Sequence, residues 1–234
     1  MAKPCPDPSM PACIVPAAGA SSRMGAHKLL LPFRDAAGRR RTMVETSVGI
    51  ALEAGCRVIL VVGRDAEKVA EPFSGEPRVV IVHNPDWERG MVGSIQRGIE
   101  ALGRCSGESS DAPSRENARS VRSVRSVREG GFFIHHADMP LVEPAVFGFL
   151  RAVAVSRAAA GAPPIPLFAA FEGRAGHPVY IPSILAPGIL GLDPAFRMKP
   201  FLDAAGGLSV ETGCAGVLAD IDTPGEYAVS GGGK

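Results

Sequence analysis

Apolar runs and amphipathic stretches alternate along most of the chain. The apolar runs are short and rich in β-branched and aromatic residues, as expected for strands buried on both faces of a parallel sheet. They are Cys13–Val15, Arg57–Val62, Val79–Val82 and Gly131–His135. Between them, apolar residues near helical spacing predict helices over Thr42–Ala54, Asp65–Glu71, Gly93–Leu102 and Glu143–Ala160. This alternation predicts an α/β fold with a mostly parallel central sheet and helices on both faces.

Two segments depart from this alternation, within what we expect to be a single domain over residues 1–234. Residues 104–129 are rich in Ser, Arg and Glu and repeat Ser-Val-Arg three times from Ser120 to Arg128. Such polarity cannot cover a core, so we predict a disordered surface insertion. A basic arm that contacts RNA or substrate is the alternative. Residues 165–182 are hairpin-like and predict a β-rich excursion.

The first apolar run passes directly into a loop with distinctive chemistry, Pro16-Ala-Ala-Gly-Ala-Ser-Ser-Arg-Met-Gly-Ala-His-Lys28. Gly19 and Gly25 allow a positive φ and a close approach of the backbone to a ligand. Successive N–H groups of such a loop can form a nest for an anion. Arg23 and Lys28 add positive charge, one as a planar fork and the other as a point charge. We therefore predict phosphate binding, although the loop matches neither the Walker nor the dinucleotide glycine pattern.

Acidic residues follow extended segments at two later points. Asp138 comes just after the fourth apolar run, which places it at the carboxyl edge of the predicted sheet, where ligands bind in open α/β folds. In Asp220-Ile-Asp222, alternation puts both carboxylates on one side of an extended segment. Carboxylate oxygens can hold a divalent ion that neutralises phosphates. For Asp222, a helix cap or turn before Thr223-Pro224 is the alternative.

Three histidines, two of them close to Asp138 in the sequence, raise the question of a transition metal. His135, His136, Asp138 and His177 carry the imidazole and carboxylate groups that suit zinc or iron. However, neighbouring residues on a strand point to opposite faces. His135 and His136 therefore cannot easily bind one ion together, and we do not expect such a site.

The loop and several later segments together resemble one known family. Ala17-Ala-Gly-x-Ser-x-Arg-Met-Gly-x-x-Lys28 is similar to the signature loop of nucleotidyltransferases that activate small phosphorylated acceptors. Within that group it most resembles the molybdenum cofactor cytidylyltransferase family and its guanylyl-transferring relatives. Further segments match the same family in order, from about residue 13 to about residue 228: Asn84-x-x-Trp-x-x-Gly-Met-x-x-Ser94, Ala137-Asp-Met-Pro140, Gly176-His-Pro178 and Asp220-Ile-Asp-Thr-Pro224.

The resemblance implies a single Rossmann-like nucleotidyltransferase domain and a reaction that depends on Mg²⁺ or Mn²⁺. It implies that the metal is held by Asp138 and Asp222, and that catalysis involves Arg23, Lys28 and Asp138. The nucleotide-binding residues carried over from the family are Ala17, Ala18, Gly19, Ser21, Arg23, Lys28, Asn84 and Ser94. Of these, Asn84 and Ser94 would lie near the base and ribose.

The resemblance also covers the acceptor side of the site. It implies molybdenum-bearing molybdopterin as acceptor and CTP as donor, with His177 and Arg197 binding the acceptor and residues 165–182 forming that side. A molybdenum enzyme would be the delivery target. The chain departs from the family pattern at Pro16, His135-His136, Ala137 and Ala195. Because most departures lie on the acceptor side, GTP as donor, a sugar phosphate or phospholactate as acceptor, or a non-catalytic cofactor-delivery chaperone stay open.

Composition narrows the function classes. The counts of Lys plus Arg (25) and Asp plus Glu (24) argue against a nucleic-acid binder that relies on a basic surface. No stretch approaches about 18 consecutive apolar residues, so no membrane partner is expected. The five cysteines are scattered without Cys-x-x-Cys spacing, which predicts neither a disulfide framework nor structural zinc. The start of the chain lacks the apolar core of a signal peptide. We therefore expect a cytoplasmic enzyme.

Overall fold

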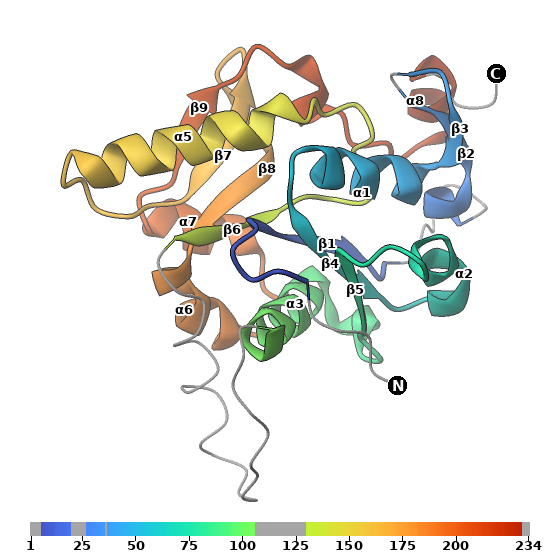
Figure 1. Ribbon diagram of the computed structural model, residues 1–234, viewed down its shortest axis with the longest axis horizontal. Helices are drawn as coiled ribbons and strands as arrows, with labels where there is room; N and C mark the ends of the chain where they lie inside the picture. Colours follow the sequence, from blue (N-terminus) through green and yellow to red (C-terminus); the bar gives the residue numbers. More distant parts are fainter. Residues whose placement is uncertain (1–5, 20–26, 36, 106–129, 231–234) are drawn as a thin grey trace, which may run out of the picture.

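The computed structural model describes residues 6–19, 27–35, 37–105 and 130–230 (Figure 1). A seven-stranded sheet lies at its centre, in the order β5-β4-β1-β6-β8-β7-β9. Its strands are β1 (Ala12–Ala17), β4 (Arg57–Val62), β5 (Val79–His83), β6 (Gly131–Ile134), β7 (Leu167–Phe171), β8 (Arg174–Pro182) and β9 (Leu208–Glu211). The four strands predicted from apolar runs are therefore all present, with β4 at the predicted bounds.

The sheet is mostly parallel, as the alternating pattern predicts. Strand β1 pairs in parallel with β4 and β6, β4 with β5, and β7 with β9. Strand β8 is antiparallel to both β6 and β7. Residues 165–182 are β-rich, as expected, but β7 and β8 continue the central sheet from β6. The antiparallel β8 brings its own residues beside those of β6, which places Ile134 opposite Val179.

Helices cover both faces of this sheet (Figure 1). They are α1 (Met43–Glu53), α2 (Ala66–Ala70), α3 (Met91–Cys105), α5 (Ala145–Ala159), α6 (Ala186–Leu190), α7 (Met198–Ala204) and α8 (Pro224–Val229). Short 3-10 turns connect them: η1 (Lys28–Leu30), η2 (Glu71–Phe73), η3 (Trp87–Arg89), η5 (Ser183–Leu185) and η6 (Ala215–Leu218). Helix α1 begins where sequence predicts, because Thr42 and Glu45 form a capping box. It ends before Gly55, whose φ is +79°.

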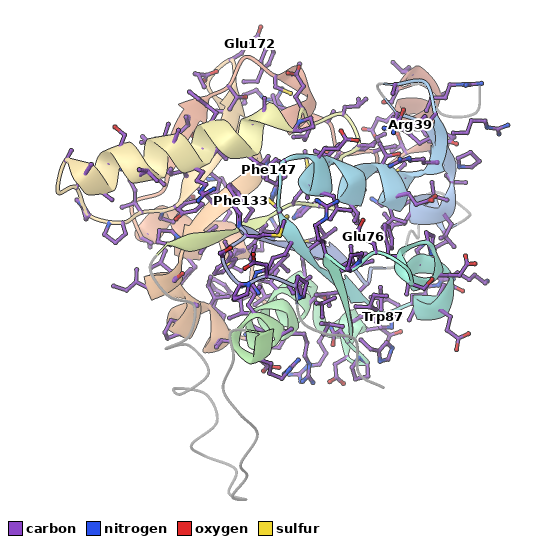
Figure 2. The ribbon with its side chains drawn as sticks, in the orientation of Figure 1. Arg39, Glu76, Trp87, Phe133, Phe147 and Glu172 are labelled. Atoms are coloured by element: carbon purple, nitrogen blue, oxygen red, sulfur yellow. The ribbon has the colours of Figure 1, made fainter. Side chains whose placement is uncertain are left out.

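Two apolar clusters lie on opposite faces of the sheet because successive strand residues alternate in direction. In β1, Cys13 and Val15 pack toward α1 and α5, whereas Ile14 packs toward α3 and α6. Figure 2 shows Phe133 of β6 beside Phe147 of α5, with ring centroids 5.1 Å apart in an edge-to-face arrangement. These two clusters pack the sheet between its helices.

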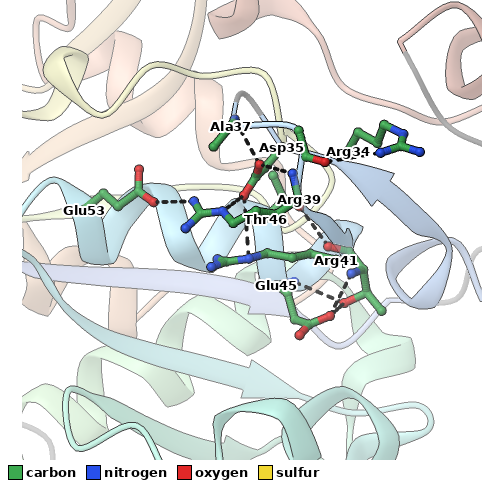
Figure 3. Close-up of polar contacts among 10 residues, drawn as sticks. Arg34, Asp35, Ala37, Arg39, Arg41, Glu45, Thr46 and Glu53 are labelled. Atoms are coloured by element: carbon green, nitrogen blue, oxygen red, sulfur yellow. Dashed lines mark hydrogen bonds and ion pairs between the residues drawn. The ribbon is translucent and has the colours of Figure 1, made fainter. Parts of the chain in front are cut away.

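A small hairpin, β2 (Pro32–Arg34) and β3 (Arg40–Thr42), lies beside α1. Asp35 closes its turn, accepting hydrogen bonds from the backbone N–H groups of Ala37 and Arg39 and from the Arg39 guanidinium (Figure 3). The Tyr227 hydroxyl of α8 donates to the carbonyl of Pro32. This contact ties the C-terminal segment to the hairpin and so brings residues just before α8 close to η1.

Parts of the earlier predictions fall on residues that the structure does not describe. Residues 106–129, which make up nearly all of the predicted insertion over 104–129, lie outside the described residues, as do Ser21 and Arg23. Helix α3 ends at Cys105 and β6 begins at Gly131. The prediction of disorder is therefore wrong for residues 104 and 105, which continue the helix. Among the described helices, none has the length and apolarity that a membrane span requires.

Candidate active site

Three charged side chains from distant parts of the sequence meet beyond the carboxyl edge of the sheet. Lys28 lies in η1, Asp138 follows β6, and Asp222 precedes α8. The Lys28 ammonium nitrogen donates to Asp138 Oδ2 at 2.5 Å and to Asp222 Oδ1 at 2.5 Å. The side chains of Lys28, Asp138 and Asp222 are 13%, 21% and 40% exposed. The structure thus brings together the lysine and both aspartates predicted for phosphate and metal binding.

The backbone around the two aspartates fixes their separation. The Ile221 N–H donates to the Asp138 carbonyl at 3.0 Å, which joins the two acidic segments directly. Turn η6 is in very close contact with two other segments, one at Leu141 and one at Gly176 of β8. A Cβ at Gly216 would lie 1.9 Å from the Leu141 carbonyl oxygen, and one at Gly176 would lie 1.9 Å from that of Val217. This close approach gives a physical reason for the glycine of Gly176-His-Pro178.

Asp222 does not cap the helix that follows it. Thr223 is the N-cap of α8 and forms a capping box with Glu226. The Asp222 backbone N–H also donates to the Glu226 carboxylate, at 2.9 Å. The carboxylate of Asp222 is directed to Lys28 instead. Of the two interpretations of Asp222, the charged site and the helix cap, the geometry favours the charged site.

The electrostatics of the three charges are those of a cation position. Burial disfavours the charged form of Lys28, but the attraction of Asp138 and the hydrogen bonds that Lys28 donates to both carboxylates outweigh it and hold the Lys28 pKa above its usual value. At the edge of the cluster, burial and the nearby charges of Asp222 and Asp138 raise the pKa of Asp220. Positive charge is therefore favoured where Asp138 and Asp222 converge.

These residues fit a divalent metal. Two carboxylate oxygens converge on one positively charged nitrogen, and Asp138 Oδ1 is buried without a hydrogen-bond partner in the described part of the chain. Hard cations such as Mg²⁺ take carboxylate oxygens and usually complete their shell with water and substrate phosphates. Across residues 6–19, 27–35, 37–105 and 130–230, no group of three or more His, Cys, Asp or Glu is placed to hold an ion.

The nucleotide side is only partly described. Ala17 ends β1, Ala18 follows it as a buried residue, and Gly19 is exposed. Gly19 does not take the positive φ expected of it, and a Cβ there would meet no atom of the described residues within 4 Å. Its glycine is therefore not required by the backbone conformation seen here. Ser21 and Arg23, the other loop residues predicted to bind nucleotide, lie outside the described residues.

Asn84 and Ser94 are buried and hydrogen-bonded to each other. The Asn84 amide donates to the Ser94 hydroxyl at 3.0 Å, and its carbonyl oxygen accepts from the backbone N–H of Asp86 at 3.1 Å. These bonds hold the segment between β5 and α3 in place. The contact of Asn84 and Ser94 with a nucleotide stays a prediction, and in this structure the two residues shape the loop.

A pocket of about 430 Å³ lies between the sheet and helices α3 and α7, and its lining includes His136, two residues before Asp138. His177 and Arg197, the two residues predicted to bind the acceptor, both line it. Most of the wall is apolar. Its larger apolar members are Met91, Ile95, Ile134, Phe168, Val179, Phe196, Met198 and Leu202. Met91 and Phe196 are about half exposed, at 52% and 47%, so the pocket presents unusual apolar surface to a ligand.

Comparison with known families decides the class of this site. A profile described as the MobA-like NTP transferase domain matches residues 13–208. The chain belongs to this family. As a member of the MobA-like NTP transferases it is a nucleotidyltransferase, as its loop and ordered motifs predict.

Individual relatives agree with this assignment. The chain is 26% identical over 215 residues, or 92% of each chain, to the molybdenum cofactor cytidylyltransferase of Escherichia coli K12. A nucleotidyl transferase from Methanothermobacter thermautotroptrophicus has a TM-score of 0.68, with 23% identity over 95% of this chain and 96% of its own. Rv0371c from Mycobacterium tuberculosis H37Rv, solved in complex with manganese, has a TM-score of 0.61, with 21% identity over 95% and 98%. The two structures support the same fold.

Several residues of this MobA-like site were not predicted from sequence. Met91, Phe168 and Phe196 line the pocket from α3, β7 and the segment before α7. They are apolar residues beside recognised motifs, and apolar residues in an α/β chain are ordinarily assigned to the core. His136 also lines the pocket; its signal in the sequence was the replacement of a usual apolar residue.

The adjacent histidines separate as alternation predicts. His135 is fully buried against Phe147, with ring centroids 5.5 Å apart, whereas His136 stacks on His177 at 3.8 Å. Burial lowers the pKa of His135 to about 3, that of His136 to about 4 and that of His177 to about 3. In each case burial is the largest cause, because a charged imidazole is poorly solvated there.

Replacing His135 with leucine is expected to stabilise this protein. Neither ring nitrogen of His135 has a hydrogen-bond partner within the described residues, and an unsatisfied buried polar group costs about 1–3 kcal/mol. We expect His135→Leu to raise the free energy of unfolding by about 1 kcal/mol, or the melting temperature by about 2–4 °C. Thermal unfolding at neutral pH measures this gain, and a lower melting temperature would contradict it.

The same variant should lose part of the acid sensitivity of folding. Because the folded His135 pKa is about 3 against an ordinary 6.5, the unfolded chain binds a proton in that interval that the folded chain does not. Stability is therefore lost as pH falls through this window, by up to about 1.4 kcal/mol per pH unit for one group. A shallower slope in His135→Leu than in wild type, measured by urea unfolding, would bear this out.

Proposed function

We propose that this nucleotidyltransferase transfers CMP from CTP to the phosphate of molybdenum-bearing molybdopterin and releases pyrophosphate. The observation that carries the proposal is the junction of two half-sites. Asp138, at the cation position with Asp222, lies two residues from His136 in the wall of an apolar pocket that also holds His177 and Arg197. The name of the Escherichia coli relative, a molybdenum cofactor cytidylyltransferase, supports both the donor and the acceptor.

The chemistry needs charge compensation more than it needs a protein nucleophile. An oxygen of the acceptor phosphate attacks the α-phosphorus of the triphosphate, and the bond from that phosphorus to the pyrophosphate oxygen breaks. The acceptor phosphate is already anionic, so no protein base has to remove a proton. Lys28, and by resemblance Arg23, would hold the triphosphate oxygens and stabilise charge as it shifts to pyrophosphate.

Asp138 and Asp222 are the residues that would hold Mg²⁺ or Mn²⁺. When bound, such an ion would supply Lewis-acid neutralisation of phosphate charge. The two carboxylates would orient it at the mouth of the pocket. The manganese complex of Rv0371c supports a divalent cation in this group of folds.

The pocket favours an acceptor with a flat ring. Phe168, Phe196 and Met91 offer apolar and aromatic surface, which suits a heterocycle such as a pterin. Arg197 and His177 offer polar groups for a phosphate or the ring edge. A sugar phosphate or phospholactate would leave much of this apolar surface uncovered. We therefore rank molybdopterin above these acceptors and expect the reaction to take place in the cytoplasm, with a molybdenum enzyme receiving the product.

Pyrophosphate release across substrate pairs tests the proposal. CTP, GTP, ATP and UTP would each be offered with molybdenum-loaded molybdopterin, a sugar phosphate and phospholactate. We expect turnover with CTP and molybdopterin, complete loss on chelation with EDTA, and recovery with Mg²⁺ or Mn²⁺. A preference for GTP would correct the donor, and a preference for another acceptor would correct the acceptor. Binding of cofactor without pyrophosphate release in any pair would favour a delivery chaperone.

A further inference from the structure

His136 lies where the two half-sites meet. Strand β6 ends at Ile134, His135 turns into the core, and His136 lines the pocket on the opposite side. Asp138, at the cation position, is only two residues further along the chain. His136 therefore belongs to the pocket wall and lies two residues from the aspartate at the cation position.

The His136 ring is held in place by packing and keeps its polar atoms available. It lies against the His177 ring, with centroids 3.8 Å apart and planes tilted by 32°. His177 is itself placed by its Nδ1, which lies 3.4 Å from the Ile134 carbonyl oxygen. Within the described part of the chain, no hydrogen bond occupies either ring nitrogen of His136. The imidazole thus has a fixed plane and a hydrogen-bonding edge without a protein partner.

Transfer requires the acceptor to extend from the cation position into the pocket. Its phosphate must reach the cation position while the rest of the molecule lies in the pocket. Among the described residues of the lining, the polar side chains apart from His136 and His177 are those of Arg197 and Lys199, beside and in α7. Those two approach from the helix side. On the sheet side, next to Asp138, the imidazole groups of His136 and His177 are therefore the described side chains that can hydrogen-bond to the acceptor.

We propose that His136 is a further acceptor-binding residue, whose ring N–H donates a hydrogen bond to a non-bridging oxygen of the acceptor phosphate beside Asp138. This role rests on the proposed function, because it assumes a phosphorylated acceptor in the pocket. His136 orients the attacking phosphate and takes no proton in the reaction. The sequence difference at this position, where the family usually has an apolar residue, then adjusts how this chain holds its acceptor.

Two substitutions separate the hydrogen bond from the packing. His136→Phe keeps a flat ring against His177 and removes the N–H group. His136→Gln removes the ring and keeps an N–H donor of similar reach. With both substrates varied, we expect His136→Phe to raise the acceptor KM about tenfold or more, as for loss of a hydrogen bond to a charged group. The CTP KM should stay within about twofold, and His136→Gln should restore most of the loss.

The adjacent histidine supplies a matched control. His135→Leu removes an imidazole one residue away that does not line the pocket, so the acceptor KM should remain at the wild-type value. The inference is overturned if His136→Phe leaves the acceptor KM unchanged, if both KM values rise together, or if His136→Gln is as impaired as His136→Phe.

The design also separates this inference from the proposed function. The variants are compared with whichever phosphorylated acceptor the wild-type protein uses. If molybdopterin fails but a sugar phosphate or phospholactate is turned over, the proposed acceptor is wrong and His136 is still decided on the acceptor that works. If no phosphorylated acceptor is turned over, the proposed function and the role of His136 both fall.

Discussion

Replacing Asp138 with alanine is expected to abolish nucleotidyl transfer while leaving the fold intact. The carboxylate lies 2.5 Å from the Lys28 ammonium at the point where Asp222 also converges. Its removal takes away half of the proposed metal site at the reacting phosphates. Loss of one preorganised group that stabilises a transition state typically costs on the order of a hundred- to a thousandfold in rate. Loss of the metal itself would push the effect toward the limit of detection.

The fold should tolerate this change for a specific reason. Asp138 contributes its backbone carbonyl to the bond with Ile221, and alanine retains that carbonyl. Circular dichroism and thermal unfolding would check the fold, and pyrophosphate release would check the activity. Asp220→Asn is a matched control, because Asp220 is an exposed neighbour in the same acidic segment and its carboxylate is not one of the two that accept hydrogen bonds from Lys28. Its activity should stay close to wild type.

Asp222→Ala should lower the rate less completely than Asp138→Ala. The Asp222 side chain is 40% exposed against 21% for Asp138, so water can replace part of what it supplies. Wild-type turnover in Asp138→Ala would contradict the assignment of Asp138 as a metal ligand. An equally large loss in Asp220→Asn would show that net negative charge, and not ligand geometry, carries the effect.

The elements that sequence predicts well here are those with strong local signals. Strand β4 has an uninterrupted β-branched run and is buried along its whole length. Helix α1 has a capping box at Thr42 and a glycine stop at Gly55. After residue 182 the local signals are weaker, although Thr223 and Glu226 form a capping box at the start of α8. The helices α6, α7 and α8 span only five to seven residues, and tertiary contacts decide their positions.

The candidate site divides in the same way. Motif order leads to Lys28, Asp138 and Asp222, but their ion pairs join residues 110 and 194 positions apart, and no local pattern encodes such a contact. The pocket is harder still to predict. Met91, Phe168 and Phe196 come from three separate elements, and only the packing of α3 and α7 against the sheet places them around one cavity. Their exposed surface becomes evident only once that packing is known.

Replacing Lys28 with alanine is expected to weaken triphosphate binding and slow transfer with every acceptor. The ammonium carries a positive charge at the centre of the site, between the carboxylates of Asp138 and Asp222. Loss of one charge-assisted contact is worth about 1.5–3 kcal/mol, or roughly ten- to over a hundredfold. Removing Lys28 also leaves the carboxylates of Asp138 and Asp222 facing each other. We therefore expect Mn²⁺ to raise the melting temperature of Lys28→Ala more than that of wild type.

His177→Ala provides the comparison that gives the Lys28 result its meaning. His177 lines the pocket and stacks on His136, so its loss should raise the acceptor KM and leave triphosphate affinity nearly unchanged. Titration with a non-hydrolysable triphosphate measures the triphosphate affinity, and steady-state kinetics measure the acceptor KM. Equal loss of triphosphate binding in both variants would show that the site is not divided into a phosphate half and an acceptor half. If Lys28→Ala weakens triphosphate binding and His177→Ala raises only the acceptor KM, the phosphate half of the site lies at Lys28 and the acceptor half at the stacked histidines.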